Sequence, residues 1–360
     1  MQSGSDTDDM PKHAQRDKMR DITTSPRGGT VTISDVARSV GVATSTVSRA
    51  LSTPNRISEP MRKRIFAAAA ELGYVPNPQA KALTSGRTLR VALLVPDITN
   101  PYFFDLIRGT QSQLKQHGYR HILVDSENSL EVEAAALAEL PGSVDGLIVM
   151  GAHPPFERLL EVADRTPLVV INREIEGIPS VVVDTPTAMA EVVAHLASLG
   201  HTDIAYLAGR QSSWSCQMRW QAIEAASIRL GVRCRKIGPF DLPMPAGAAE
   251  ADAALEAGVT ACIFFNDLLA IRALQRFAAL GIVVPDRMSV VGCDDIFGAD
   301  FCNPPLTTLT APTEQAGRVA TDMLLRQIQE QPTGQVKNPY RVKVPARLTI
   351  RSSTGVRKTR

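Results

Sequence analysis

Residues 31–86 decide how the first part of this chain is organised, and they read VTISDVARSVGVATSTVSRALSTPNRISEPMRKRIFAAAAELGYVPNPQAKALTSG. Thr32, with Asp35 three residues later, is a pattern typical of a helix start. The apolar residues that follow at helical spacing are Val36, Ala37 and Val40. Gly41 then allows a left-handed turn, so the stretch predicts a short helix that ends there.

A second helix is expected almost directly after that turn. Its apolar side consists of Val47, Ala50 and Leu51, and its polar, cationic side consists of Thr44, Ser45, Ser48 and Arg49. Two short helices joined by a few residues around a glycine form a helix-turn-helix. The second helix of this motif can lie in the major groove with its N-terminal side chains at the base edges, so the pattern predicts binding to double-stranded DNA.

Two further helices are expected in the same stretch. Ser58 caps a third helix, Pro60 lies in its first turn and Gly73 ends it. Its apolar positions are Ile65, Ala68, Ala69 and Leu72. Asn77-Pro78, a cap followed by proline, then opens about two helical turns that end at Ser85-Gly86. Ala80 and Leu83 lie on one side of this last helix.

Several ordered motifs of the chain match a known family. DVARSVGVATSTVSRAL, ELGYVPN and AKAL resemble the DNA-binding headpiece and hinge helix of the LacI/GalR family of bacterial transcription regulators, and LGHTDIAYL, FFNDLLAI, VVGCDD and PPLTTL continue the resemblance. It covers roughly Thr30 to Ser352. The resemblance implies a regulator, here a repressor, that binds a pseudo-palindromic operator as a homodimer and responds to a small-molecule effector.

Composition is compatible with this class of protein. The chain has 360 residues, enough for two or three domains, and is 44% hydrophobic and 21% charged. It has no run of 18 apolar residues and no apolar core near its N-terminus, so we expect a cytoplasmic protein without a membrane partner. Its five cysteines show no CxxC spacing, which favours reduced thiols over a metal or redox site.

Charge is localised although the chain as a whole is only +2. Residues 30–89 contain eight Lys or Arg against three acidic residues, which leaves about +5 on this segment. A local cationic surface on a nearly neutral chain is typical of contact with DNA phosphates. Residues 1–29 mix acidic, basic and small polar residues with few apolar ones, so we expect a disordered tail there.

From Arg90 onward the periodicity becomes that of a doubly wound α/β fold. Apolar runs typical of buried parallel strands lie at 91–95, 121–124, 146–150, 168–171 and 181–183, and helical patterns lie at 104–117, 131–140 and 156–163. The alternation repeats after Pro186, with strands at 204–208, 261–265 and 289–293 and helices at 187–199, 216–230 and 267–280. This predicts two similar doubly wound, parallel-sheet units. The resemblance implies that they form two lobes, as in periplasmic binding proteins, with a cleft between them.

The expected domains follow from these patterns and from the family arrangement. They are a tail (1–29), a helix-turn-helix domain (30–76), a hinge helix and linker (77–88), an effector-binding and dimerisation core (89–352) and a C-terminal tail (353–360). The resemblance implies that the chain crosses between the lobes near Asp184, near Thr310 and again within 331–344. The N-lobe then comprises about 89–184 and 311–331, and the C-lobe about 185–310 and 344–352.

Ligands of such sheets bind beyond the carboxyl ends of the strands. The residues there are polar with a few aromatics, a composition that suits a ligand rich in hydroxyl groups, such as a sugar or sugar derivative. Asn266-Asp267 could also simply cap a helix, and the adjacent acids Asp294-Asp295 require partners if they are buried. The resemblance implies that Arg219, Asn266 and Asp294 bind the effector and that Tyr102 and Phe103 lie in the loop that lines it. With the strand-end residues Asn172 and Asp267, these are the predicted effector contacts. The chain departs from the family at Asn172, where many sugar-binding members have Asp, and at Ala222, where Gly is usual.

The predicted DNA contacts come from the helix-turn-helix and the hinge. They are Thr32, Thr44, Ser45, Thr46, Ser48, Arg49, Asn55, Asn77, Ala80 and Leu83. Arg49 is the side chain best suited to a bidentate contact with guanine, although it could instead contact a phosphate. Leu83 is expected to act as an apolar wedge in the minor groove, on a hinge helix too short to form alone in water.

Other functional classes have less support in the sequence. An enzyme on this core would need a phosphate loop or an activated nucleophile, and GxGxxG, GxxxxGK[ST], GxSxG and HExxH are all absent. His195 and His201 are six residues apart, which does not suit metal ligands on one helix, so neither a cofactor nor a metal is expected. The remaining alternatives are a regulator that responds to a nucleobase or a protein, and a non-regulatory sugar-binding protein.

Overall fold

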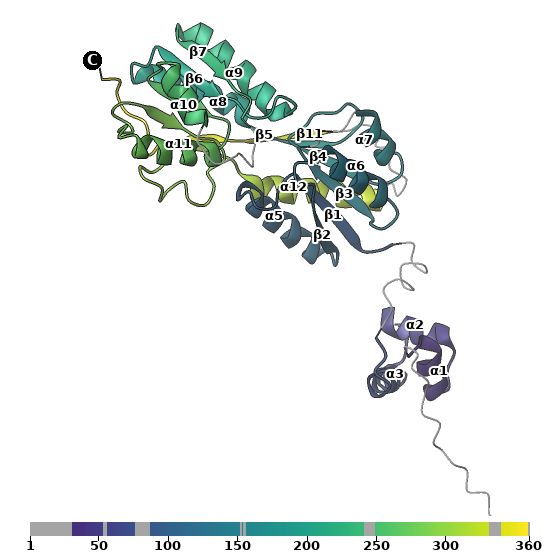
Figure 1. The fold of residues 1–360 in the computed structure, drawn as a ribbon. Coiled ribbons are helices and arrows are strands. Elements are labelled where there is room, and N and C mark those ends of the chain that lie inside the picture. The colour runs from purple at the N-terminus through teal and green to yellow at the C-terminus, as the bar shows by residue number, and fades with distance from the viewer. Residues whose placement is uncertain are drawn as a thin grey trace, which may run out of the picture. The chain divides into compact units, whose positions relative to one another are not determined.

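The computed structural model describes residues 31–52, 56–75, 87–151, 153, 156–240, 249–330 and 340–358. The chain divides into two compact units, Met1–Pro78 and Gln79–Arg360, each of which is described by itself (Figure 1). Within the described ranges, no helix is long and apolar enough to cross a membrane.

The first unit contains the predicted helices α1 (Ile33–Val40), α2 (Thr44–Ser52) and α3 (Glu59–Glu71). At the start of α1, the carboxylate of Asp35 accepts hydrogen bonds from the backbone N and Oγ1 of Thr32, at 2.9 and 2.7 Å. Gly41 ends α1 with a φ of 72°, as the sharp turn requires. The three helices share a small core made of Val36, Ala37, Val40, Val47, Ala50, Ile65 and Ala69.

The second unit contains two parallel sheets, and we call the part around the first sheet the N-lobe. Its strand order is β11-β5-β4-β3-β1-β2, and every neighbouring pair is parallel. The strands are β1 (Arg90–Val95), β2 (Arg120–Asp125), β3 (Gly146–Met150), β4 (Leu168–Ile171), β5 (Ser180–Asp184) and β11 (Arg341–Pro345). The five apolar runs predicted from the sequence are therefore confirmed as strands.

Helices cover both faces of this sheet, which explains why its central strands are apolar throughout. One face packs against α5 (Tyr102–Gln116) and α12 (Thr313–Glu330), and the other against α6 (Leu130–Glu139) and α7 (Phe156–Ala163). Successive residues alternate between the two cores: Leu93 belongs to the first and Leu94 to the second. Figure 1 shows α12 beside α5 and beneath the strands.

The C-lobe is built in the same way around a sheet of order β7-β6-β8-β9. Its strands are β6 (Asp203–Leu207), β7 (Arg233–Ile237), β8 (Ala261–Phe264) and β9 (Ser289–Val291). One face packs against α8 (Thr185–Ser198) and α9 (Trp214–Leu230), and the other against α10 (Ala249–Glu256) and α11 (Asp267–Ala279). An antiparallel pair, β10 (Thr308–Thr310) and β12 (Arg347–Thr349), completes the lobe.

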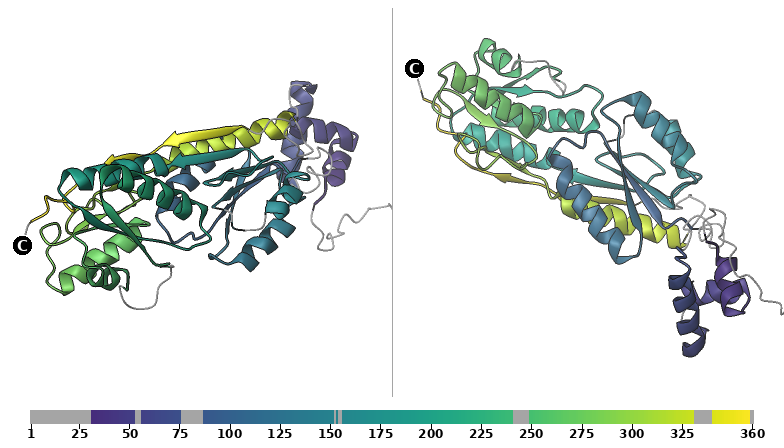
Figure 2. Two further views of the ribbon diagram at one scale, coloured as in Figure 1. Left: turned by 90° about the horizontal axis from the view of Figure 1, so that it is seen from above. Right: turned by 60° about the horizontal axis from the view of Figure 1, so that its bottom comes forward.

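The chain passes between the lobes after β5, after β10 and after β11. The first two crossings lie where the resemblance implied. The third differs, because β11 pairs with β5 as far as Pro345 and so belongs to the N-lobe sheet, which moves the crossing from 331–344 to Ala346. In Figure 2 the yellow C-terminal elements accordingly extend along the second unit through both lobes.

Candidate functional site

A cavity lies between the two lobes at the carboxyl ends of their strands, as expected for this type of sheet. Its volume is about 160 Å³, it opens to solvent, and it is lined by residues of both lobes. Six of the seven predicted effector contacts line it: Tyr102, Phe103, Asn172, Arg219, Asn266 and Asp294. They come from the first turn of α5, the end of β4, the interior of α9, the start of α11 and the segment after β9.

On the N-lobe side, Asn172 orients Tyr102. Asn172 follows β4 with a φ of 54°, a left-handed conformation that asparagine tolerates. Its Oδ1 accepts a hydrogen bond from Val183 N at 3.0 Å, and its Nδ2 donates to the Tyr102 hydroxyl at 2.9 Å. Burial raises the pKa of Tyr102, so the phenol keeps its proton and can donate it to a ligand. The ring of Phe103 packs edge-on against Tyr102, with centroids 5.1 Å apart.

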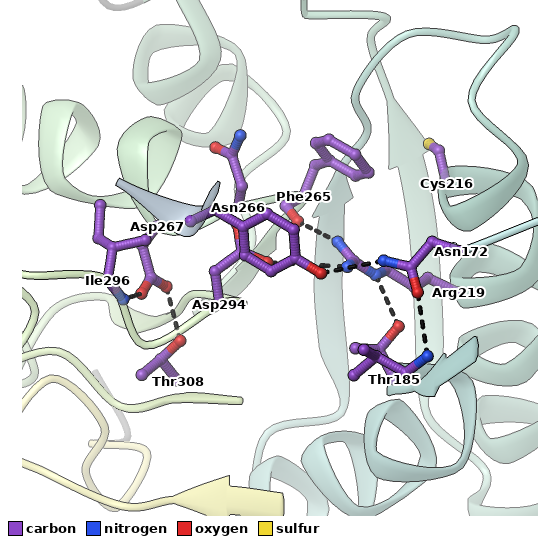
Figure 3. A network of polar contacts seen from close by, with 12 residues as sticks. Asn172, Thr185, Cys216, Arg219, Phe265, Asn266, Asp267, Asp294, Ile296 and Thr308 are labelled. Carbon is purple, nitrogen blue, oxygen red and sulfur yellow. Dashed lines mark hydrogen bonds and ion pairs between the residues drawn. The ribbon is translucent and has the colours of Figure 1, made fainter. Parts of the chain in front are cut away.

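On the C-lobe side, Arg219 projects from α9 and is almost fully buried. Its Nε donates to Thr185 Oγ1 at 3.0 Å and its Nη1 to the carbonyl of Phe265 at 2.7 Å (Figure 3). Its Nη2 lies 3.8 Å from Asp294 Oδ1, and the guanidinium also lies over the Phe265 ring, 5.0 Å from the centroid. Arg219 is thus held rigidly at the wall of the cavity, which favours one ligand orientation.

Asp294 is the buried acid of the site. Burial raises its pKa well above the ordinary value, and the charge of Arg219 opposes this rise. The residue has a φ of 133°, and its backbone N donates to Leu309 O at 2.9 Å, which holds this strained conformation in place. A buried carboxyl group beside a guanidinium offers a donor and an acceptor to one ligand hydroxyl group.

The expectation that Asp294 and Asp295 need partners is met by two arginines of the protein itself. Asp294 faces Arg219, while Asp295 accepts a hydrogen bond from Arg351 Nη2 at 2.7 Å. Thr310 Oγ1 also donates to Asp295, at 2.7 Å. The two neighbouring carboxyl groups therefore point in different directions, and Asp294 is the one that lines the cavity.

The two residues at the start of α11 also differ in position. Asn266 caps the helix, because its Oδ1 accepts from Leu269 N at 3.0 Å, and it lines the cavity as well. The prediction for Asp267 needs correction. Its carboxylate is fully buried away from the cavity, where it accepts from Thr308 Oγ1 at 2.6 Å and Ile296 N at 3.0 Å (Figure 3). Burial raises its pKa to about 6, and its contacts attach α11 to β10 and the segment after β9.

Several lining residues were not predicted from the sequence. They are Arg210, Ser213, Ser215, Phe240 and Phe265. Arg210 follows β6, so the strand-end rule that pointed to the other contacts would have found it if applied to that strand. Ser213 caps α9 by accepting from Cys216 N at 3.3 Å, a role that a serine just before a helical pattern indicates. Phe265 ends the predicted strand 261–265 and belongs to the motif FFNDLLAI, so the strand-end rule would also have found it. Phe240 belongs to none of the motifs quoted above.

The predicted DNA contacts divide into described and undescribed residues. Thr44, Ser45, Ser48 and Arg49 are exposed on α2, Thr46 is half-buried there, and Thr32 is exposed before α1. These positions present a polar, cationic face of α2 opposite its buried Val47 and Ala50. Asn55, Asn77, Ala80, Leu83 and the predicted hinge helix lie outside the described residues.

The histidines of the C-lobe take part in hydrogen bonds within the protein. The described ranges contain no cluster of three His, Cys, Asp or Glu residues that could hold a metal ion. His201 is buried and its ring nitrogens lie near Thr260 Oγ1, Ser289 Oγ and the carbonyl of Gly355, at 2.8 to 3.1 Å. His195 lies 3.0 Å from Thr354 Oγ1. Both histidines contact the C-terminal segment.

Comparison with known proteins gives the family of this chain. Residues 32–77 match the family model for bacterial regulatory proteins of the lacI family, and residues 193–354 match the periplasmic binding protein-like domain. The HTH-type transcriptional repressor CytR of Escherichia coli (strain K12) is 32% identical over 84% of this chain and 91% of its own length. The HTH-type transcriptional regulator DegA of Bacillus subtilis (strain 168) is 31% identical over 90% of this chain and 98% of its own length.

Solved structures agree with this assignment. The Lac repressor bound to ONPG in its repressed state is 27% identical, covers 91% of this chain and all of its own, and superposes with a TM-score of 0.79. A complex of the transcriptional regulator CelR with cellobiose is also 27% identical, covers 90% of this chain and 99% of its own, and superposes with a TM-score of 0.66. The chain combines a helix-turn-helix headpiece with a two-lobed effector core, and it belongs to the LacI family of transcriptional regulators.

Proposed function

We propose that this regulator represses transcription from a pseudo-palindromic operator and that a sugar or sugar derivative in the cleft between its lobes controls its operator affinity. The observation that carries the proposal is the convergence of six polar and aromatic side chains, predicted from the sequence, on one cavity. The cellobiose complex of CelR supports a carbohydrate as the ligand class. Since such a protein acts on chromosomal DNA, we place it in the cytoplasm.

The chemistry of the cavity supports a ligand that has both hydroxyl groups and an apolar face. Tyr102, Arg219 and Asp294 supply donors and acceptors, and Phe103 and Phe265 supply rings against which a sugar ring can pack. A nucleobase is the second candidate, because Phe103, Phe240 and Phe265 also offer apolar surface to a planar ring.

We propose that the functional unit is a homodimer, because one headpiece covers a single half-site of an operator. A crystal structure of the Lac repressor dimer on its operator is among the similar structures. Sedimentation of the full-length chain should show two copies per particle, alone and on DNA. A monomer on DNA would contradict this part of the proposal.

A thermal-shift screen of sugars, sugar acids and purines on the full-length chain tests the ligand. A ligand at 100 times its Kd should stabilise the folded chain by about 2.7 kcal/mol. We expect a sugar to raise the Tm of the wild type and of Arg229→Ala, which removes an exposed arginine of α9 outside the cavity. The same sugar should leave the Tm of Arg219→Ala unchanged.

Operator binding of the same variants separates the two parts of the proposal. Without effector, Arg219→Ala should bind operator nearly as the wild type does, and its binding should no longer respond to the ligand. Arg219→Lys keeps a cation if the alanine variant proves unstable. A purine as the stabilising compound would favour the second candidate, and an equal ligand response in wild type and Arg219→Ala would remove Arg219 from the site.

A further inference from the structure

The segment through which the chain enters the second unit, residues 87–89, is bound to the start of β3. Asp145, directly before β3, accepts hydrogen bonds at Oδ1 from Thr88 N at 2.6 Å and Thr88 Oγ1 at 2.7 Å. Its Oδ2 accepts from Leu89 N at 3.0 Å. Three hydrogen bonds from two consecutive residues to one carboxyl group fix the path of the backbone there.

The backbone at this point is strained. Leu89 has a φ of 52°, a left-handed conformation that is rare for a large side chain. Its N–H is bound by Asp145, and its carbonyl accepts from Arg120 N at 2.8 Å at the start of β2. Such a conformation persists only where the surrounding contacts enforce it, so Asp145 and the edge of the sheet together hold Leu89.

The same segment is attached to α12. Arg87 Nη2 donates to the carbonyl of Ile328 at 3.2 Å, in the last turn of that helix. At its other end α12 begins three residues after β10, where the chain crosses from the C-lobe to the N-lobe. One helix therefore extends from a crossing between the lobes to the segment that leads toward the DNA-binding helices.

Close packing leaves α12 no room to shift against its neighbours. A Cβ on Gly109 of α5 would lie 2.2 Å from the carbonyl oxygen of Glu314, and one on Gly317 would lie 2.5 Å from that of Leu106. A Cβ on Gly146, next to Asp145, would lie 3.0 Å from Leu324. The glycines let α12 contact α5 and β3 directly, and a packed interface of this kind transmits displacement instead of absorbing it.

We propose that Asp145 is a positioning residue that sets the direction in which the chain leaves the core toward the DNA-binding helices. The contact between Arg87 and α12 links this direction to the orientation of the lobes. The inference rests on the proposed function, because it assumes two half-sites contacted by a dimer. It adds a residue outside the effector cavity, at the opposite ends of the strands.

The experiment uses half-site spacing as its readout. An operator is first selected by the full-length wild type from a random duplex library, and its affinity is measured with the native spacing and with one base pair inserted between the half-sites. Since a fixed exit direction suits one spacing, the wild type should lose at least 10-fold in affinity on the longer site. Asp145→Ala should bind the native site about 10-fold more weakly and should discriminate less than 3-fold between the two spacings.

Two further variants separate positioning from mere loss of stability. Arg87→Ala removes an exposed side chain at the surface of the core and should also reduce the discrimination between spacings. Glu139→Ala, which removes an exposed carboxylate at the end of α6, should keep the wild-type profile. Arg87→Ala keeps the test open if Asp145→Ala does not fold, as judged by circular dichroism.

The outcomes distinguish the inference from the proposed function. A wild type that selects no operator contradicts the proposed function. A wild type with a sharp spacing preference that Asp145→Ala and Arg87→Ala both retain overturns the inference and leaves the proposed function intact. A Tm lowered in Asp145→Ala together with an unchanged spacing profile would show that Asp145 only stabilises the core, which also overturns the inference.

Discussion

The side-chain amide of Asn172 determines which hydrogen-bonding groups the cleft offers to a ligand. The chain has Asn where many sugar-binding members of the family have Asp, and the structure uses both ends of the amide. Its Oδ1 accepts from Val183 N while its Nδ2 donates to the Tyr102 hydroxyl. A carboxylate could not donate, so the Tyr102 O–H would turn toward it and be lost to a ligand. Asn172 thus leaves the Tyr102 proton available in the cavity.

Arg49 is the residue that we predict to recognise the base sequence of the operator. It is exposed on α2, and an arginine on a recognition helix can make a bidentate contact with guanine. Arg49→Ala should therefore lose about 1–3 kcal/mol of binding free energy on the operator and little on random DNA, measured by fluorescence anisotropy. Lys63→Ala, which removes an exposed charge of α3, is the matched control. Equal losses for Arg49→Ala on both DNAs would mean that Arg49 contacts a phosphate.

Among the elements, the C-terminal segment after β12 is attached to the C-lobe through histidines. His201 lies near Ser289 Oγ and the carbonyl of Gly355, and His195 lies near Thr354 Oγ1. Burial lowers the pKa of both histidines below the ordinary 6.5, and the charge of Arg357 lowers that of His201 further. Both rings are therefore neutral in the folded protein at pH 7.

These shifts predict that acid destabilises the C-lobe. A histidine whose pKa is lower in the folded chain binds its proton preferentially in the unfolded chain, so the stabilisation is complete above pH 6.5 and is lost as the pH falls below it. Each such histidine lowers the free energy of unfolding by at most about 1.4 kcal/mol per pH unit. Urea unfolding at pH 7.5, 6.5 and 5.5 should show a smaller decrease for His201→Gln than for the wild type.

His117→Gln provides the control for this measurement, because it removes an exposed histidine at the end of α5. Its decrease should match that of the wild type. If His201→Gln and the wild type lose stability in parallel between pH 7.5 and 5.5, protonation of His201 does not explain the acid sensitivity.

The elements that could be predicted from the sequence are those in which the apolar or polar character of each residue matches its burial in the fold. The central strands are continuous apolar runs because helices cover both faces of each sheet. β7 was missed because it is an edge strand that reads Arg-Cys-Arg-Lys-Ile, and its first and third residues pair with Asp203. α12 was missed because its apolar residues are interspersed with polar ones that meet partners in the core, such as Gln327 with Leu168.

The same reasoning explains which residues of the cleft could be predicted from the sequence. The strand-end rule located Asn172, Asn266 and Asp294 because it depends on topology, which the apolar runs reveal. It could not separate Asp294 from its neighbours, because whether a carboxylate turns toward a cavity or toward Thr308 depends on long-range packing. Asp267 was misassigned for that reason.

At the scale of the whole molecule, a hydrogen bond between described residues joins the lobes across the cavity. Arg210, after β6 of the C-lobe, donates from Nη1 to the carbonyl of Asn128, after β2 of the N-lobe, at 2.9 Å. Asn128 and Glu127 before it both have left-handed backbones, with φ of 54° and 52°, and both Asn128 and Arg210 line the cavity. The contact forms only when the lobes are close, so it favours the closed orientation.

Arg210→Ala should therefore shift the lobes toward an open orientation. A hydrogen bond from a charged donor contributes about 1.5–3 kcal/mol. Without this contact, part of the ligand's binding free energy is used to close the lobes. Loss of the contact should therefore weaken effector binding by roughly 10- to 150-fold. Calorimetric titration with the ligand found in the screen measures the affinity. X-ray scattering of the effector-free chain should give a larger radius of gyration for the variant, and saturating ligand should reduce it.

Arg229→Ala removes the same charge from the exposed side of α9 and should change neither quantity. The linkage between sites adds a second requirement. If lobe closure couples the cleft to the operator, the effector favours the closed orientation and Arg210→Ala favours the open one. The two changes should therefore shift operator affinity in opposite directions. Arg210→Ala, measured without effector, must change operator affinity in the direction opposite to the change that the effector causes in the wild type. Ligand affinity, scattering and operator affinity that all match the wild type would show that Arg210 does not contribute to closure.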